Sequence, residues 1–350
     1  MHPQTVLLAL SGGVDSAVAA LLLKERGFHV VGAFLKLWSP QQGEQGGCYW
    51  RDERRDAYAV GARLGIPVIT LDFEREYREE VMETFYRSYA AGETPNPDLL
   101  CNSKIKFPLL RKEAERRGFD HVATGHYARV SRDEEGITHL LVSEDQEKDQ
   151  TYFLARLGEA DLKQTLFPIG EYTKTAVREM AARAGIQVWN KRSTRGICFI
   201  GKVDLPLFLE QRIANVPGDI RTADGELLGH HAGLHHFTIG QRHGFGLGGG
   251  NPYYVSEKLL ETKTLVVTKT AQPLYSMQAL LRNLHWIGGE PATSLPLFAR
   301  IRYRAPLVSV VRSGQTVIFA EPQRAVTPGQ ELVFYSGEVC LGSGTIVRAE

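Results

Sequence analysis

The segment Ser11–Ser16, with the sequence Ser-Gly-Gly-Val-Asp-Ser, constrains the fold of this chain more than any other part of it. It follows Val6–Leu10, an apolar run typical of a buried parallel strand, and precedes Ala17–Arg26, which has the composition of a helix. Backbone N–H groups at a helix N-terminus point outward, glycines leave room for a ligand, and the helix dipole favours negative charge. The segment therefore predicts a phosphate-binding loop. The alternative is an ordinary Gly-Gly turn between a strand and a helix.

The loop differs from two common nucleotide-binding loops. A Walker A loop needs a lysine after its second glycine, and a dinucleotide-binding loop needs Gly-x-Gly-x-x-Gly; the segment matches neither pattern. Asp15 also stands where its carboxylate would repel a bare phosphate. Because a bridging Mg²⁺ would remove that repulsion, we predict Mg²⁺ beside Asp15.

The first part of the chain predicts a parallel sheet. At 350 residues the chain is long for a single core, so two or three domains are expected. Apolar runs alternate with helical segments in residues 1–204, which predicts a doubly wound α/β domain whose ligands bind beyond the carboxyl ends of the strands. The predicted strands are Val6–Leu10, His29–Leu35, Val68–Asp72 and His121–Thr124. The predicted helices are Ala17–Arg26, Glu53–Leu64, Arg75–Ala91 and Phe107–Arg117.

Two smaller β-rich domains are predicted to follow. Residues 205–272 are rich in Gly and His and contain short strand-like pieces, which predicts a small central domain. Residues 273–350 contain recurring short strands separated by turn signals, a pattern typical of a small antiparallel β-barrel. One of these predicted strands is Ala299–Tyr303. Its alternation would place Arg300, Arg302 and Arg304 on one face, which suits contact with RNA phosphates.

Composition excludes several classes of protein. The chain has no signal-peptide pattern at its start, and no apolar run approaches the ~20 residues that span a membrane. We therefore expect a cytoplasmic protein with no membrane partner. The formal net charge of +1 argues against an indiscriminate polyanion binder. The 4 cysteines form no Cys-x-x-Cys pair, so reduced thiols are expected.

Two of the cysteines stand in unusual surroundings. Cys101 follows a proline-stiffened loop, 94–98, and precedes Lys104 and Lys106, so its thiol is predicted to ionise readily. Cys198 is flanked by glycines, which permit close backbone approach. The alternative for each is a small, buried apolar side chain, which is the common state of a cysteine.

Several short motifs, in this order and spacing, make the chain resemble the tRNA-specific 2-thiouridylase (MnmA) family of ATP pyrophosphatases. The resemblance covers nearly the whole chain. The motifs are Ser11–Ser16, Asn96–Asp98 with Cys101, Ala123–Arg129, Lys148–Leu154, Gly196–Gly201, Thr238–Arg242 and Gly337–Gly342.

The resemblance implies an enzyme, a tRNA-uridine 2-sulfurtransferase. Members of the family replace O2 of the wobble uridine with sulfur in tRNAs for Lys, Glu and Gln, after ATP has adenylated O2. By the family's pattern, Cys198 carries a persulfide that a cysteine desulfurase or a sulfur-relay protein loads. Cys101 is then the partner thiol that ends in a disulfide with Cys198, and Asp98 is an acid/base residue. A soft sulfur nucleophile attacking an activated carbon agrees with these roles.

The resemblance also implies which residues bind the two substrates. ATP contacts are expected from Ala9, Leu10, Ser11, Gly12, Gly13, Val14, Asp15, Ser16, Leu35 and Gly125. Contacts with the anticodon region of tRNA are expected from Asn96, Pro97, Asp98, His126, Lys148, Asp149, Gln150, Arg302, Tyr303 and Gln330. The target base must leave the anticodon stack to reach the sheet, so base flipping is expected.

Two other functions fit parts of the sequence. Another ATP pyrophosphatase, such as a lysidine-forming or amide-forming ligase, would use the loop but would not need both cysteines. A tRNA-binding sulfur carrier would need a cysteine but would not hydrolyse ATP. Release of AMP in the presence of tRNA and a persulfide donor separates an enzyme from a carrier.

Overall fold

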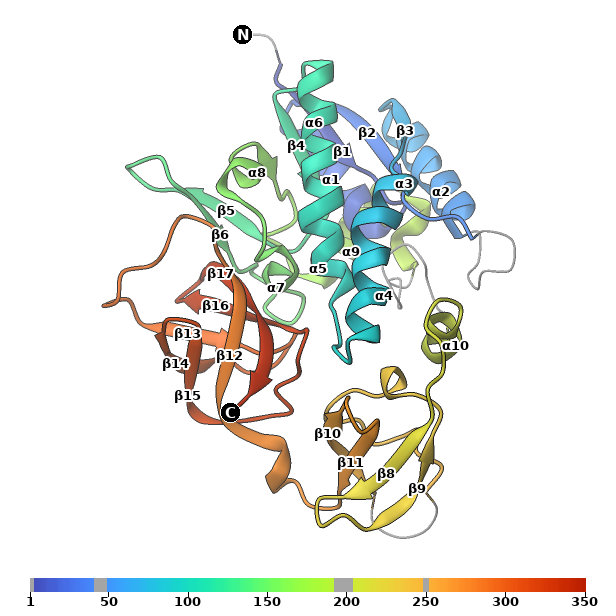
Figure 1. Cartoon of the computed structure of the whole chain (residues 1–350). Helices are drawn as coiled ribbons and strands as arrows, with labels where there is room; N and C mark the ends of the chain where they lie inside the picture. The colour runs from blue at the N-terminus through green and yellow to red at the C-terminus, as the bar shows by residue number, and fades with distance from the viewer. Residues whose placement is uncertain (1–2, 41–48, 192–203, 248–251) are drawn as a thin grey trace.

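The computed structural model describes residues 3–40, 49–191, 204–247 and 252–350. Within these residues the chain forms an α/β part, a small β-sheet and a β-barrel (Figure 1). None of the described helices is long and apolar enough to cross a lipid bilayer.

A five-stranded parallel sheet forms the centre of the α/β part, in the order β3-β2-β1-β4-β7. The strands are β1 (Thr5–Ala9), β2 (His29–Lys36), β3 (Val68–Asp72), β4 (His121–Thr124) and β7 (Thr165–Leu166). Val6, Leu7 and Leu8 of the central strand are fully buried because helices cover both faces of the sheet. The chain turns from β1 toward β2 on one side, while β4 lies on the other, and ligands bind at such switch points.

Helices pack on both faces, which confirms the predicted doubly wound fold. One face carries α1 (Val14–Glu25), α2 (Tyr49–Leu64) and α9 (Lys174–Arg183), followed by η3 (Gln187–Asn190). The other carries α3 (Glu74–Tyr77), η1 (Arg78–Met82), α4 (Glu83–Ala90), η2 (Cys101–Lys106) and α6 (Phe107–Arg117). A short helix, α5 (Pro97–Leu100), leads directly into η2. The segments η1 and η2 are π-helical turns, wider than an α-helix, which the apolar pattern does not predict.

The small β-sheet has four strands in the order β10-β11-β8-β9. These are β8 (Gly218–Thr222), β9 (Leu227–His231), β10 (Tyr254–Leu259) and β11 (Thr264–Thr268). The helix α10 (Leu205–Glu210) precedes them, and the turns η4 (Leu234–His236) and η5 (Gln272–Leu274) lie within and after this part.

The C-terminal part is a closed antiparallel barrel, as predicted. Its strand order is β12-β15-β14-β13-β16-β17, and pairing of β12 with β17 closes it. The strands are β12 (Tyr275–Trp286), β13 (Leu297–Arg300), β14 (Val308–Ser313), β15 (Thr316–Arg324), β16 (Glu331–Ser336) and β17 (Val339–Ala349).

A hairpin from the first part of the chain extends the barrel sheet. It consists of β5 (Arg129–Arg132) and β6 (Thr138–Leu141), and β6 pairs with β17 through Leu140 and Cys340. The short helices α7 (Thr151–Leu154) and α8 (Glu159–Lys163) follow this hairpin. The barrel is therefore joined to the α/β part by main-chain hydrogen bonds as well as by side chains.

The predicted strand Ala299–Tyr303 is wrong in its second half. The strand β13 ends at Arg300, and residues 301–304 form a turn in which Arg304 has a φ of 62°. Strand alternation therefore does not apply, and Arg302 does not share a strand face with Arg300. The alternation of side chains along the sequence does not reveal a residue with a left-handed backbone conformation, so it could not predict where this strand ends.

Candidate functional site

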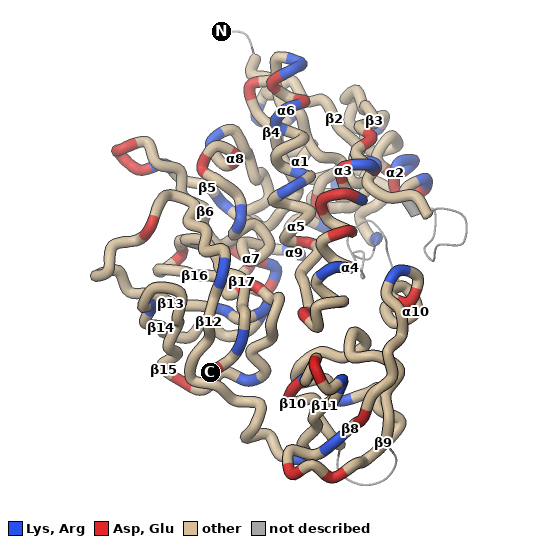
Figure 2. Tube along the Cα trace, viewed as in Figure 1, with Lys and Arg blue, Asp and Glu red and all other residues tan. Residues whose placement is uncertain are grey.

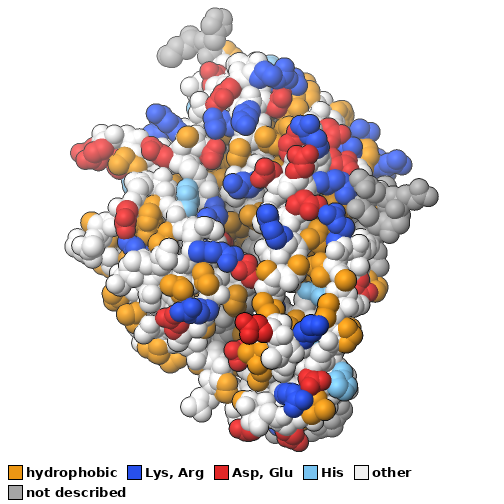
Figure 3. Space-filling model, in the orientation of Figure 1, with side chains coloured by type: hydrophobic (Ala, Val, Ile, Leu, Met, Phe, Trp, Pro, Cys, Tyr) orange, Lys and Arg blue, Asp and Glu red, His pale blue; other side chains and the backbone are white. Residues whose placement is uncertain are grey.

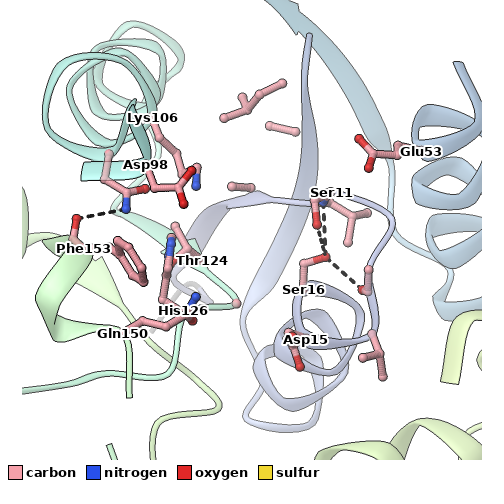
Figure 4. Close-up of a pocket in the computed structure, with 18 of the residues that line it drawn as sticks. Ser11, Asp15, Ser16, Glu53, Asp98, Lys106, Thr124, His126, Gln150 and Phe153 are labelled. Atoms are coloured by element: carbon pink, nitrogen blue, oxygen red, sulfur yellow. Dashed lines mark hydrogen bonds between the residues drawn. The ribbon is translucent and has the colours of Figure 1, made fainter. Parts of the chain in front are cut away.

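A pocket of about 310 Å³ opens at the carboxyl ends of β1, β2 and β4 (Figure 4). The segment Ser11–Ser16 and the start of α1 form one wall. The opposite wall comes from α5, η2 and residues 124–153, and Figure 4 draws Asp98 and Phe153 there, across from Ser16. The pocket thus lies where the phosphate loop was predicted to bind its ligand.

Two serines fold the loop back on itself. The hydroxyl of Ser16 donates to the Gly13 carbonyl at 3.1 Å and accepts from the Ser11 backbone N–H at 3.2 Å. The helix α1 begins at Val14, and its N-cap, Gly13, has no side chain to satisfy the first N–H groups. These groups remain available to an anion, as an anion site requires.

Two glycines permit the close packing behind the loop. Gly12 has a φ of 73°, a conformation that L side chains rarely adopt. A Cβ on Gly125 would lie 2.5 Å from the Ser16 backbone nitrogen, so the chain after β4 packs directly on the first turn of α1. Gly125 also lines the pocket. Any larger residue there would push the loop out of position.

Asp15, the carboxylate predicted to hold Mg²⁺, has two partners inside the protein. Lys174 Nζ lies 2.5 Å from Asp15 Oδ1, and the hydroxyl of Tyr127 donates to the same oxygen at 3.0 Å. Burial and the charge of Asp15 raise the pKa of Tyr127, which remains a phenol. The Lys174 ammonium therefore offsets the negative charge that was expected to require a metal ion.

The pocket can still contribute to Mg²⁺ binding. Mg²⁺ usually takes one or two protein carboxylates and completes its shell with substrate phosphates and water. Asp15 and Glu53 both line the pocket, whereas the described residues contain no group of three His, Cys, Asp or Glu side chains arranged as a metal site. The donor set fits a metal that arrives with a phosphate ligand, not one held by the protein alone.

A second lysine supports the loop from behind. Lys191 Nζ lies 2.7 Å from Asp56 Oδ2 and donates to the Gly12 carbonyl at 3.3 Å. Burial raises the pKa of Glu53, and the charge of Lys191 opposes that shift. Lys174 and Lys191 thus bring two positive charges to a loop whose own segment has none.

The opposite wall carries polar side chains at four-residue spacing. Asp98, Asn102 and Lys106 all line the pocket, and Figure 4 shows Asp98 and Lys106 side by side. The Asn102 amide donates from Nδ2 to the Phe153 carbonyl at 3.0 Å. Asp98, predicted as an acid/base residue, therefore does lie at the pocket.

His126 borders the same wall as a neutral side chain. Its Nδ1 is 2.8 Å from the Thr124 hydroxyl, and its ring lies 5.7 Å from the Phe107 ring. Burial, with a smaller contribution from the charge of Lys106, lowers the pKa of His126 well below its usual value. A neutral imidazole can both donate and accept a hydrogen bond at the pocket.

Cys101 is fully buried and does not line the pocket. Its helical run begins at Pro97, and Asn96 Oδ1 caps it by accepting from the Leu99 N–H at 3.2 Å. Cys101 therefore lies in the second turn and packs in the core beneath the sheet. Its readily ionising thiol stays a prediction. Cys198, predicted to carry the persulfide, lies outside the described residues.

All but one of the predicted ATP residues line the pocket. The pocket is lined by Ala9, Leu10, Ser11, Gly13, Val14, Asp15, Ser16, Leu35 and Gly125, while Gly12 is not among the lining residues. Their ligand stays a prediction.

The predicted tRNA residues of the 148–150 segment have different exposures. Gln150 lines the pocket, and its Oε1 accepts from the Tyr127 N–H at 2.9 Å. Asp149 is only 3% exposed and accepts from the Thr151 hydroxyl at 2.6 Å. Burial raises the pKa of Asp149. Asp149 shapes this loop, and direct contact of its carboxylate with RNA would require the loop to open.

One predicted tRNA residue of the barrel, Tyr303, contacts the pocket wall, whereas Arg302 bonds within the barrel. The Tyr303 ring lies 4.5 Å from the Phe153 ring, which lines the pocket. Arg302 donates to the backbone carbonyl of Arg324 at 2.5 Å, and burial lowers the pKa of Arg302. The turn after β13 thus brings an aromatic ring close to one end of the site.

The loop before α5 is tied to the barrel. Gln330 donates from Nε2 to the Thr94 carbonyl at 2.7 Å, and Arg282 makes two hydrogen bonds of 2.7 Å to the Glu93 carboxylate. The segment that carries Asn96, Pro97 and Asp98 is therefore held between the sheet and the barrel.

Charge is mixed over the face shown in Figures 2 and 3. Lys and Arg alternate with Asp and Glu instead of forming one continuous basic field. This agrees with the formal net charge of +1. The face is hollowed between the α/β part, the barrel and the small sheet (Figure 3).

Sequence reasoning missed several residues of the site. They are Glu53, Asn102, Lys106, Tyr127, Lys174 and Lys191. Asn102 and Lys106 follow Asp98 at helical spacing, a signal that a helix beginning at Pro97 would have revealed. Lys174 lies 159 residues from Asp15, and no local pattern links two residues so far apart.

Three family models match the chain in succession. A tRNA methyl transferase HUP domain matches residues 4–202, a tRNA methyl transferase PRC-barrel domain matches 207–269, and an aminomethyltransferase beta-barrel domain matches 276–346. The chain is also 44% identical, over 98% of its length and 95% of the relative's, to the tRNA-specific 2-thiouridylase MnmA of Streptococcus uberis.

Similar solved structures are more distant. One is a 4-thiouridine synthetase in complex with RNA and ATP, at 17% identity and a TM-score of 0.39, with 60% of this chain and 50% of that chain covered. Another is the NMN synthetase of Francisella tularensis, at 18% identity and a TM-score of 0.37, with 59% of this chain and 72% of that chain covered.

Proposed function

The chain belongs to the tRNA-specific 2-thiouridylase family, and from this premise we propose that it replaces O2 of a tRNA uridine with sulfur at the expense of ATP. One observation carries the proposal: a single pocket has an anion loop on one wall and the acid/base candidate Asp98 on the opposite wall. A nucleotide bound at the loop would direct its phosphates toward a base held at the other wall.

The first proposed step activates the base. Uridine O2 forms a bond to the α-phosphorus of ATP, and pyrophosphate leaves. The free N–H groups and the dipole of α1 hold the phosphates, while Ser11 and Ser16 keep the loop closed behind them. Asp98 receives the proton that the base loses as O2 becomes a leaving group. ATP would bind with Mg²⁺ held at Asp15, where the ion supplies charge neutralisation on the phosphates.

The second proposed step transfers sulfur. The terminal sulfur of a Cys198 persulfide bonds to C2, the C2–O2 bond breaks, and O2 leaves with AMP. Cys101 then attacks the Cys198 sulfur, so the S–S bond breaks and the transferred sulfur stays on the base. A Cys101–Cys198 disulfide remains, which a thiol reductant opens before a persulfide donor reloads Cys198. Because Cys101 is buried, this step requires η2 to shift and expose it.

We propose further that the anticodon region of tRNA binds across the pocket mouth and the barrel. The contacts would come from Asn96, Pro97, His126, Lys148, Gln150, Arg302, Tyr303 and Gln330. Tyr303 supplies a ring for base stacking, and Arg302 a guanidinium for phosphate contact. We propose that the substrates are the tRNAs for Lys, Glu and Gln. We also propose that the chain divides into domains at residues 1–204, 205–272 and 273–350.

The test is nucleoside mass spectrometry of tRNA from a strain that lacks this protein. We expect wobble 2-thiouridine to disappear, to return with the wild-type chain and to stay absent with Cys198→Ser. Undiminished 2-thiouridine in the deletion strain would refute the substrate. Restoration by Cys198→Ser would refute the persulfide mechanism while leaving the substrate intact.

A further inference from the structure

The wall opposite the phosphate loop contains a buried amide that the proposed reaction does not use. Within η2, Cys101 and Ile105 are fully buried among apolar side chains, whereas Asn102 lines the pocket. Asn102 is nevertheless only 3% exposed, so its polar atoms are shielded from water. It lies four residues from both Asp98 and Lys106, which line the same wall.

One contact fixes which way the Asn102 amide points. Its Nδ2 donates to the Phe153 carbonyl at 3.0 Å, and a carbonyl can only accept. The reversed amide would set two oxygens against each other, so this orientation follows from chemistry. Oδ1 then has no hydrogen-bond partner among residues 3–40, 49–191, 204–247 and 252–350. A buried acceptor without a donor costs stability unless a ligand supplies that donor.

We infer that Asn102 is a specificity-determining residue whose Oδ1 accepts a hydrogen bond from N3–H of the target uracil as the base binds, before Asp98 takes that proton during activation of O2. The inference rests on the proposed function. Uracil and cytosine both carry O2, so activation of O2 alone does not distinguish them. Uracil offers a donor at N3, whereas cytosine offers a lone pair there that would face Asn102 Oδ1. A buried acceptor thus accepts uracil and rejects cytosine.

The position of the wall favours the base over ATP as the donor. Ser11 and Ser16 line the phosphate wall, whereas Asp98, Lys106 and Phe153 lie across the pocket in Figure 4. The Phe153 carbonyl that holds the Asn102 amide belongs to this second wall, and the Phe153 ring faces Tyr303 of the barrel. The Asn102 amide and the Phe153 ring both line the pocket and together would hold a flipped pyrimidine.

The test is a cycle that changes both the protein and the RNA. Single-turnover thiolation is measured for tRNA carrying U or C at the wobble position, with the wild type, Asn102→Ala and Asn102→Leu, which refills the volume should the alanine variant fold poorly. We expect the wild-type preference for U over C to fall by about tenfold or more in the Asn102 variants. ATP affinity measured without tRNA should not change. Ser103→Ala, on the same turn but outside the pocket lining, is the control and should keep the preference.

The possible results distinguish failure of the Asn102 inference from failure of the proposed function. Equal slowing of U and C tRNAs by the Asn102 variants would overturn the inference, because a purely structural role slows both alike. A loss confined to ATP affinity would overturn it as well and assign the amide to adenine. Absence of 2-thiouridine with the wild type and U-bearing tRNA would instead overturn the proposed function, and the inference with it.

Discussion

Lys174 at the start of α9 is paired with Asp15 in the first turn of α1, with 2.5 Å between Nζ and Oδ1. The lysine side chain is 13% exposed and the aspartate side chain 31% exposed, so water screens the pair only partly. The lysine therefore cancels the charge of Asp15 beside the loop that is expected to bind phosphate. The protein itself thus reduces the repulsion between Asp15 and phosphate that the sequence pattern predicts.

We expect Lys174→Met to weaken ATP binding. Without the ammonium, the Asp15 carboxylate is uncompensated next to the phosphates, and a loss of about tenfold in affinity follows from one such charge at the edge of a protein. The loss should be largest at low Mg²⁺ and shrink as Mg²⁺ takes over the neutralisation. Isothermal titration with ATP at several Mg²⁺ concentrations measures both effects.

Lys174→Arg is the matched control, because it keeps the charge. It should bind ATP within a fewfold of the wild type. Equal ATP affinity of Lys174→Met and the wild type at low Mg²⁺ would contradict the role assigned to the pair.

Gly125→Ala should disturb the loop more than the fold. The added Cβ would lie 2.5 Å from the Ser16 nitrogen, where backbone must move to make room. We expect a loss of about 1–3 kcal/mol in the free energy of unfolding and a larger relative loss of ATP binding. Gly158→Ala is the control, since its Cβ would have no atom closer than 3.9 Å. Denaturant unfolding and ATP titration of both variants test this, and an unaltered ATP affinity in Gly125→Ala would be the contrary result.

Glu93→Gln should loosen the segment that carries Asp98. The substitution removes the charge of the carboxylate that accepts two hydrogen bonds of 2.7 Å from Arg282. The Glu93 side chain is only 17% exposed. We expect a loss of about 1–2 kcal/mol in stability, together with weaker tRNA binding. Glu113→Gln, which breaks contacts within α6 only, should change stability less and leave tRNA binding unaltered. Identical effects of the two substitutions would argue against a tie between the loop and the barrel.

His126 should make the protein sensitive to mild acid. Burial holds its pKa well below the usual value, so the folded state keeps the neutral ring while the unfolded chain takes up a proton near pH 6.5. Stability from this group is therefore present above pH 6.5 and declines below it, by up to about 1.4 kcal/mol per pH unit. In His126→Asn this share of the decline disappears. Urea unfolding between pH 5 and 8 compares the two slopes, and parallel slopes would contradict the assignment.

The sequence predicts an element well when the interactions that form it join residues close together in the chain. The bounds of β3, β4 and α6 match the predicted segments because local signals define them: short apolar runs for the two strands and the left-handed Gly118 after the helix. The phosphate loop is likewise identifiable because its glycines, its hydroxyls and its helix N-terminus are adjacent in the chain. The barrel could be predicted as a class from recurring short strands.

What could not be predicted depends on contacts between distant residues. The hairpin β5–β6 joins the barrel through Leu140 and Cys340, which no local pattern connects. Lys191 donates a hydrogen bond to the Gly12 carbonyl, although the two residues are 179 positions apart in the chain. Its local sequence does not distinguish it from a solvent-exposed lysine. The π-helical turn η2 turns Cys101 into the core, whereas sequence alone suggested a thiol near a helix N-terminus.

The most direct test of the proposed function is a reconstituted reaction. The purified full chain is incubated with tRNA bearing a wobble uridine, ATP, Mg²⁺ and a persulfide donor, and the AMP and 2-thiouridine formed are both counted. We expect one AMP for each 2-thiouridine, and no 2-thiouridine when ATP is omitted or when Cys198→Ser is used. Formation of 2-thiouridine without ATP, or by the Cys198→Ser protein, would contradict the proposal.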